Sequence, residues 1–201
     1  SMVNTVGDDN TLAGLARQRI QGKPFTVTEY EHPAPNYHGA ESPLLLAAYA
    51  GLQDWDGLWL FAYGSGNDMS PMGYVGSYFE IAQHPTKMAN LLLAANLFRR
   101  GDVRPALQDY AMALAPEREL DLLQNTWAWN LFGSGQLGVP GQLAFLSRLS
   151  TSVGTNAAGR TNAPIVPPGN LLISDTGELT WNVNAPGQGL VTFDTARTKA
   201  M

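Results

Sequence analysis

The sequence predicts a protein of the α/β class, with helices and strands alternating over residues 1–103 and a β-rich domain over residues 104–201. Two observations support this prediction. Helical periodicity and short β-branched or aromatic runs follow one another in the first half as helix, strand, helix, strand, helix, which is typical of βαβ units. Short strands separated by Gly, Pro and Asn turns dominate the end of the chain.

The first helix and strand lie within residues 11–30. Apolar residues at helical spacing predict a helix over residues 11–21, and Gly22 is a suitable C-terminal cap. Pro24 then precedes a predicted strand over residues 25–30. The prolines of the His-Pro-Ala-Pro-Asn segment 32–36 predict an irregular loop after that strand.

A second helix-strand-helix series follows this loop. Pro43 suits the first turn of a helix that continues to Gln53. Residues 58–63 (Leu-Trp-Leu-Phe-Ala-Tyr) form an uninterrupted apolar run, which predicts a strand in the middle of a parallel sheet. Residues 85–100 predict another helix, whose apolar side carries Met88, Leu91, Leu92, Ala95 and Phe98.

Beyond residue 103 the pattern predicts a strand within residues 104–115 and a short helix over residues 117–123. Residues 142–150 fit a strand and a helix equally well. Residues 152–170 have the composition of a long loop. Turn signals at 175–177 and 186–189 separate three short predicted strands, at residues 170–174, 178–183 and 190–194.

The composition excludes several classes of function. A net charge of −5 with scattered basic residues gives no surface for nucleic acid or for an anionic membrane. The chain has no cysteine and three histidines, so we expect no metal site, and we expect no cofactor. The apolar run 44–50 is far shorter than the roughly 20 residues of a membrane helix.

No signal peptide is visible, and the Ser1-Met2 start is typical of tag cleavage, so the sequence leaves the cellular location open.

One carboxylate occupies a position typical of an active site. In K-P-F-T-V-T-E-Y-E-H (residues 23–32), Glu29 stands where the apolar strand pattern stops. Side chains at strand ends converge at the active sites of barrel enzymes. The pattern alone also fits an ordinary exposed carboxylate.

Three segments carry a resemblance to a known family: residues 23–36, residues 41–64 (E-S-P-L-L-L-A-A-Y-A-G-L-Q-D-W-D-G-L-W-L-F-A-Y-G) and residues 84–103. Together they resemble strands seven and eight of a retaining (β/α)8 glycoside hydrolase of the clan that includes cellulase-like and β-galactosidase-like families. The resemblance covers residues 11–103 and continues more weakly into a tail similar to the β-domain, sandwich-like, that follows such barrels.

The resemblance implies that Glu29 is the catalytic nucleophile. It also implies a general acid/base glutamate directly behind an asparagine, and the sequence contains no Asn-Glu pair. A complete barrel needs roughly 200 to 250 residues. We therefore expect a partial barrel followed by a truncated β-domain, that is, a fragment of a larger glycosidase that lacks the acid/base and is inactive alone.

Carbohydrate is the expected ligand, as an oligo- or polysaccharide. Tyr30, His32 and Asn36 follow Glu29 as candidate substrate-binding residues, and Trp59 and Tyr63 offer aromatic faces for a sugar ring. Asp68 and residues 78–80 could border the cleft, and Trp127 and Trp129 could form a further platform. Some of these have a structural alternative: His32 as a loop-packing residue, Trp55 and Trp59 as core residues, and one of Trp127 and Trp129 as a buried residue.

Two other functions remain open at this stage. The β-rich tail and the five tryptophans also fit a non-catalytic carbohydrate-binding module. Alternatively, the chain is an assembly unit, because an exposed half-barrel edge favours association with another copy. We therefore expect a homo-oligomer.

Overall fold

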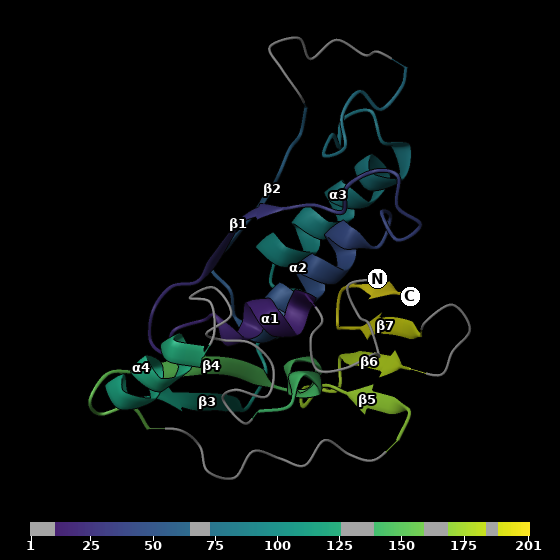
Figure 1. The fold of residues 1–201 in the computed structure, drawn as a ribbon. Helices are drawn as coiled ribbons and strands as arrows, with labels where there is room; N and C mark the ends of the chain where they lie inside the picture. The colour runs from purple at the N-terminus through teal and green to yellow at the C-terminus, as the bar shows by residue number, and fades with distance from the viewer. Residues whose placement is uncertain (1–10, 65–72, 126–138, 159–168, 184–188) are drawn as a thin grey trace.

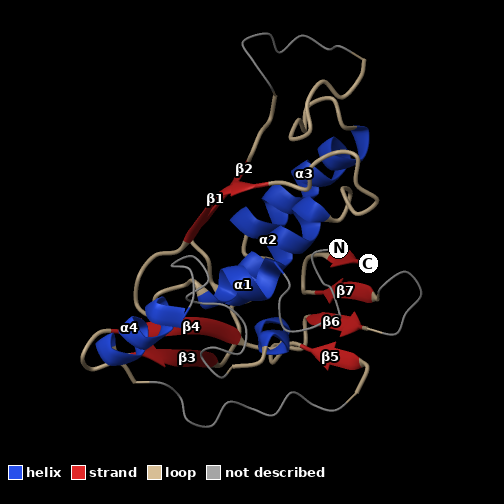
Figure 2. Ribbon diagram, in the orientation of Figure 1, coloured by secondary structure: helices blue, strands red, loops and turns tan. Residues whose placement is uncertain are grey.

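The computed structural model describes residues 11–64, 73–125, 139–158, 169–183 and 189–201. They form a mixed α/β fold of helices and three small sheets, with no closed barrel among these residues (Figures 1 and 2). The α/β class is thus confirmed. No helix in the described part of the chain combines the length and apolarity needed to cross a membrane.

The first α/β unit consists of strand β1 (Thr26–Tyr30), helix α2 (Ser42–Gln53) and strand β2 (Gly57–Leu60). The two strands pair in parallel, as a helical crossover between them requires. In the described part of the chain β2 pairs with β1 only. The prediction of a central, fully buried strand was therefore wrong, because one edge of β2 and the side chain of Trp59 stay open to solvent.

Helix α3 (Pro85–Arg99) packs against α2 through a different face from the predicted one. Its buried residues are Lys87, Ala94 and Leu97, whereas Leu92 is 71% exposed. Most of the predicted apolar side faces β2 instead. There, a groove of about 330 Å3 separates the two helices from the strand, and Leu91, Ala95 and Phe98 line it.

Helix α1 (Thr11–Arg17) ends four residues before the predicted boundary. Ile20 forms a parallel bridge with Thr151, and the Gln21 amide donates to the Thr151 carbonyl at 2.9 Å. These sheet contacts compete with the last helical turn and replace it.

A second parallel pair lies in the region predicted to be a β-rich domain. Strand β3 (Asp109–Leu114) and strand β4 (Arg148–Val153) pair in parallel, with helix α4 (Pro116–Asn125) and the 3-10 helix η2 (Gly141–Phe145) between them. The undecided residues 142–150 therefore divide between a helical turn and a strand. The α/β pattern extends to Val153.

Gln53, at the end of α2, connects the two α/β units. It is 1% exposed, and its amide nitrogen donates to the carbonyls of Ala144 and Ser147, each at 2.7 Å. Its amide oxygen accepts from the Leu149 backbone at 2.8 Å. One buried side chain thus supplies three polar contacts, to η2, to β4 and to Ser147 between them.

The chain ends in an antiparallel sheet, visible beside α1 and α2 in Figure 1. Its strands are β5 (Leu171–Ile173), β6 (Leu179–Asn182), β7 (Leu190–Asp194) and β8 (Lys199–Ala200), in that order. The first three agree with the predicted strands, and β8 was not predicted. Trp181 of β6 packs on Phe145 with ring centroids 4.7 Å apart, which joins the sheet to the main core.

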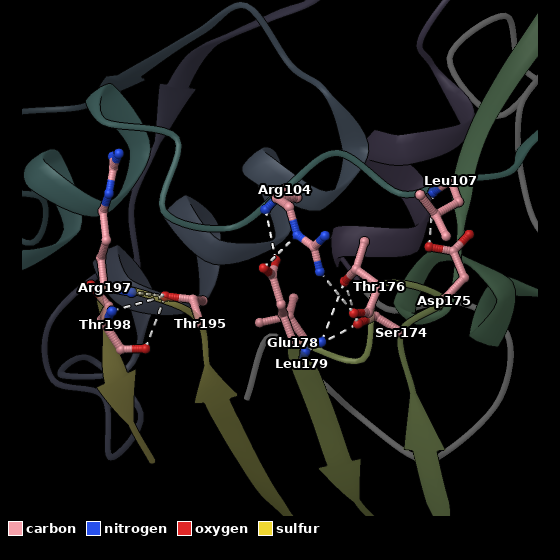
Figure 3. A network of polar contacts seen from close by, with 10 residues as sticks. All are labelled: Arg104, Leu107, Ser174, Asp175, Thr176, Glu178, Leu179, Thr195, Arg197 and Thr198. Atoms are coloured by element: carbon pink, nitrogen blue, oxygen red, sulfur yellow. Dashed lines mark hydrogen bonds and ion pairs between the residues drawn. The ribbon is translucent and has the colours of Figure 1, made fainter.

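Polar contacts fix the turns of this sheet to the segment that follows α3 (Figure 3). Arg104 donates through its backbone and its guanidinium to Glu178, at 2.8 and 2.7 Å, and Asp175 accepts from the Leu107 amide at 2.9 Å. On the neighbouring turn, the Thr195 hydroxyl accepts from the Thr198 amide. The sheet is therefore attached to the helical part by side chains as well as by apolar packing.

Candidate functional site

Glu29 lies on the exposed side of β1, one residue before the strand ends. In the β1–β2 register, Val27 pairs with Leu58 and Tyr30 with Leu60. Two residues, Thr28 and Glu29, therefore face the single residue Trp59. Such a bulge re-aims a side chain, and bulges are common next to active sites.

An aromatic surface begins beside Glu29. Trp59 is 57% exposed, so its alternative assignment as a core residue was wrong, whereas Trp55 is buried as expected. The Trp59 ring folds back over Gly57, where an added Cβ atom would lie 2.3 Å from ring atom Cζ3. Other exposed aromatic residues lie along and after β2: Phe61, Tyr63, Tyr74, Tyr78 and Phe79.

Residues 78–82 return to the end of β2. The Ala62 amide donates to the Phe79 carbonyl at 2.9 Å, and the Phe61 and Phe79 rings meet edge to face. On the other side, the Ala34 amide donates to the Tyr78 carbonyl at 2.7 Å. The loop after β1 and the segment after β2 are thus joined at the carboxyl ends of both strands.

A cavity of about 830 Å3 lies between these two segments. Asn36 and His84 contribute to its lining, together with Ala34, Pro35, Val75, Gly76, Ser77 and Tyr78. The side-chain oxygen of Asn36 accepts from the His38 amide at 2.8 Å, which shapes the loop and leaves the Asn36 amide nitrogen as a donor. The lining that the structure describes contains no Asp, Glu, Lys or Arg, and it offers the Ser77 and Tyr78 hydroxyls and the Asn36 amide.

Tyr30 and His32, both predicted to bind substrate, form an internal network. Tyr30 is buried, and its hydroxyl lies 3.2 Å from His32 Nε2. His32 Nδ1 lies 3.1 Å from the His38 carbonyl, so Nδ1 carries the proton and Nε2 accepts from Tyr30. Burial raises the pKa of Tyr30 and lowers the pKa of His32. The two side chains thus contact each other and the loop backbone at His38, and their role in substrate binding stays a prediction.

The sequence singled out Glu29 and gave no role to the acid two residues later. Glu31 forms a buried ion pair with Lys87 of α3, with Oε1 and Nζ 2.8 Å apart. The sequence contains one sign of this pair, the second acid of the T-E-Y-E-H motif. Nothing in the sequence marks Lys87, because a lysine on a helix is ordinarily exposed.

Other acids near the loop also have partners. Glu41 lies 3.5 Å from His38 Nδ1, and Glu80 is buried and accepts from the Gly76 amide at 2.7 Å. The described residues contain no group of three or more His, Asp or Glu side chains arranged to hold a metal ion. Asp68, Trp127 and Trp129 lie outside the residues that the structure describes.

Comparison with known proteins gives no relative: no family model matches the chain, and neither a curated protein nor a solved structure shows significant similarity to it.

Proposed function

We propose that this chain carries the nucleophile side of a retaining glycoside hydrolase site, with Glu29 as the nucleophile. The observation that supports it best is the bulge, which presents Glu29 on an exposed face opposite Trp59, at the carboxyl ends of two parallel strands. Both the strand end and the neighbouring aromatic ring suit a carboxylate that attacks a bound sugar.

The proposal includes an interpretation of the fold. β1, α2, β2 and α3 are taken as the last two β/α units of a (β/α)8 barrel, and β5 to β8 as part of its following β-domain. In this interpretation the exposed side of β1 that holds Glu29 faces the barrel axis, while Trp59 also borders the groove between β2 and the two helices. The general acid/base comes from outside the described residues, because Glu31, Glu41 and Glu80 are already engaged in contacts of their own.

Retaining hydrolysis needs a second carboxyl group about 5 to 5.5 Å from the nucleophile to protonate the leaving oxygen. A dinitrophenyl glycoside needs no such proton, because dinitrophenolate is a stable anion. The Glu29 carboxylate would bond to the anomeric carbon while the bond to dinitrophenolate breaks, and the electron pair leaves with that anion. A fluorine at C2 of the sugar slows hydrolysis of the resulting ester enough for it to be detected.

The test is therefore covalent labelling with a panel of 2,4-dinitrophenyl 2-deoxy-2-fluoro-glycosides, measured by intact mass and peptide mapping. We expect one sugar per chain, attached to Glu29, and no label on Glu29→Gln. Glu117→Gln, on the exposed face of α4, is the matched control and should label normally. A label on another residue, or none with any sugar, would refute Glu29 as the nucleophile.

The exposed aromatic surface favours one alternative, a glycan-binding module without catalysis. This alternative predicts that soluble oligosaccharides bind equally well to the wild type and to Glu29→Ala, measured by titration calorimetry, while neither protein is labelled.

A further inference from the structure

The strongest unexplained feature of the structure is the charged pair inside the loop region. The side chains of Lys87 and Glu31 are 0% and 2% exposed. Lys87 Nζ also donates to the His32 carbonyl at 2.6 Å, and Glu31 Oε1 accepts from the His32 amide at 2.7 Å. The pair therefore holds the backbone of His32 on both sides.

Stability alone is a poor explanation for this pair. Burying two charges removes both from water, and replacement by apolar residues of similar volume is often neutral or stabilising. Glu31 Oε2 is buried without a hydrogen-bond partner among the described residues, which adds to the cost. In addition, Lys87 lies in the first turn of α3, where the helix dipole disfavours a cation.

The position of the pair suggests what it does instead. Lys87 binds the start of the loop at His32, and at the other end a Cβ atom placed on Gly39 would lie 3.4 Å from Lys87 Cε. Between these ends, Ala34 and Asn36 line the cavity of about 830 Å3, and Ala34 holds Tyr78. One lysine thus binds the start of the loop that forms a wall of the cavity and lies close to its end at Gly39.

We propose that Lys87 and Glu31 are positioning residues for glycan binding: their ion pair holds loop 32–39 in place as one wall of the cavity. This inference rests on the proposed carbohydrate function. Glu31 lies two residues after Glu29, so the same pair also fixes the exit of β1.

The decisive variant replaces both charges, Glu31→Leu with Lys87→Met, because a single replacement leaves one buried charge unpaired and destabilises the fold. We expect the double variant to stay folded with a slightly lower melting temperature, because the His32 amide and carbonyl lose their side-chain partners. Oligosaccharide binding should weaken about tenfold, because ordering the released loop on binding then costs about 1.4 kcal/mol. Lys87→Arg alone retains a cation for Glu31, so its affinity for oligosaccharide should lie between that of the double variant and that of the wild type.

Hydrogen exchange gives a readout that needs no glycan. The Ala34, His38 and Gly39 amides are hydrogen-bonded within or from the loop, and they should exchange faster in the double variant than in the wild type, with amides of β6 and β7 as an internal reference. Unchanged exchange would show that the Lys87–Glu31 pair does not hold the loop. Faster exchange with unchanged oligosaccharide affinity would show that holding the loop plays no part in binding. If the wild type binds no oligosaccharide and is not labelled, the proposed function fails and the positioning role fails with it. The exchange data would still decide whether the Lys87–Glu31 pair holds the loop.

Discussion

Gly57 gives a direct test of whether Trp59 contacts the glycan. A Cβ atom at position 57 would lie 2.3 Å from Trp59 Cζ3 and 2.6 Å from Cη2. Carbon atoms are in contact at about 3.5 to 4.0 Å, so in Gly57→Ala the ring must retreat by roughly 1 Å. The ring is more than half exposed and can move outward without disturbing the core.

The free-energy terms predict that Gly57→Ala separates stability from binding. Replacing glycine by alanine within a strand favours folding by about 0.5 to 1 kcal/mol, which offsets the lost contact of the ring. The melting temperature should therefore stay within about 4 °C of the wild type. An aromatic contact is worth about 0.5 to 1.5 kcal/mol, so displacement of the ring should weaken oligosaccharide binding by about two- to tenfold.

Titration calorimetry and thermal melting measure the two effects, and Gly14→Ala is the control. At Gly14, in α1, an added Cβ atom meets nothing within 4 Å, so that variant should bind normally and melt at a slightly higher temperature. Wild-type affinity in Gly57→Ala would refute a role for Trp59 in binding. A large fall in melting temperature would show instead that the strand pair cannot relax around the new methyl group.

Three further predictions concern the fold around the site. Gln53→Leu removes three buried hydrogen bonds and should lower the free energy of unfolding by about 2 to 4 kcal/mol, measured by urea titration. A change below about 0.5 kcal/mol would mean that this side chain does not couple the two α/β units. Burial lowers the pKa of His32, so the folded state favours its neutral form. The contribution of His32 to stability should therefore be complete above pH 6.5 and decline as the pH falls from 6.5 toward the folded-state pKa. An imidazole NMR titration of the folded protein with a midpoint at or above 6.5 would contradict this. The open edge of β2 and the apolar groove beside it should favour self-association, so light scattering should give a mass above that of one chain, and a monodisperse monomer would argue against it.

Local signals in the sequence predicted the elements near the site well. Proline at the start of α2 and α3 and the apolar run of α2 placed both helices within a few residues, and β-branched residues placed β1. The sequence did not predict which elements pair. An apolar run such as residues 57–60 has the same composition at the open edge of a sheet as in its centre, and the parallel partner of β3 begins more than thirty residues later in the chain.

The orientation of Glu29 depends on a feature that no residue pattern announces. Under strict alternation Glu29 would share the side of Val27, which is buried, and Tyr30 would point outward with Thr28. The extra residue in the bulge reverses this order, so that Val27 and Tyr30 are both buried and Glu29 is exposed opposite Trp59. Two residues further on, Glu31 is buried against Lys87. Two glutamates of one short motif therefore have opposite environments, and it is the backbone irregularity between Val27 and Tyr30 that leaves Glu29 as the carboxylate available to a ligand.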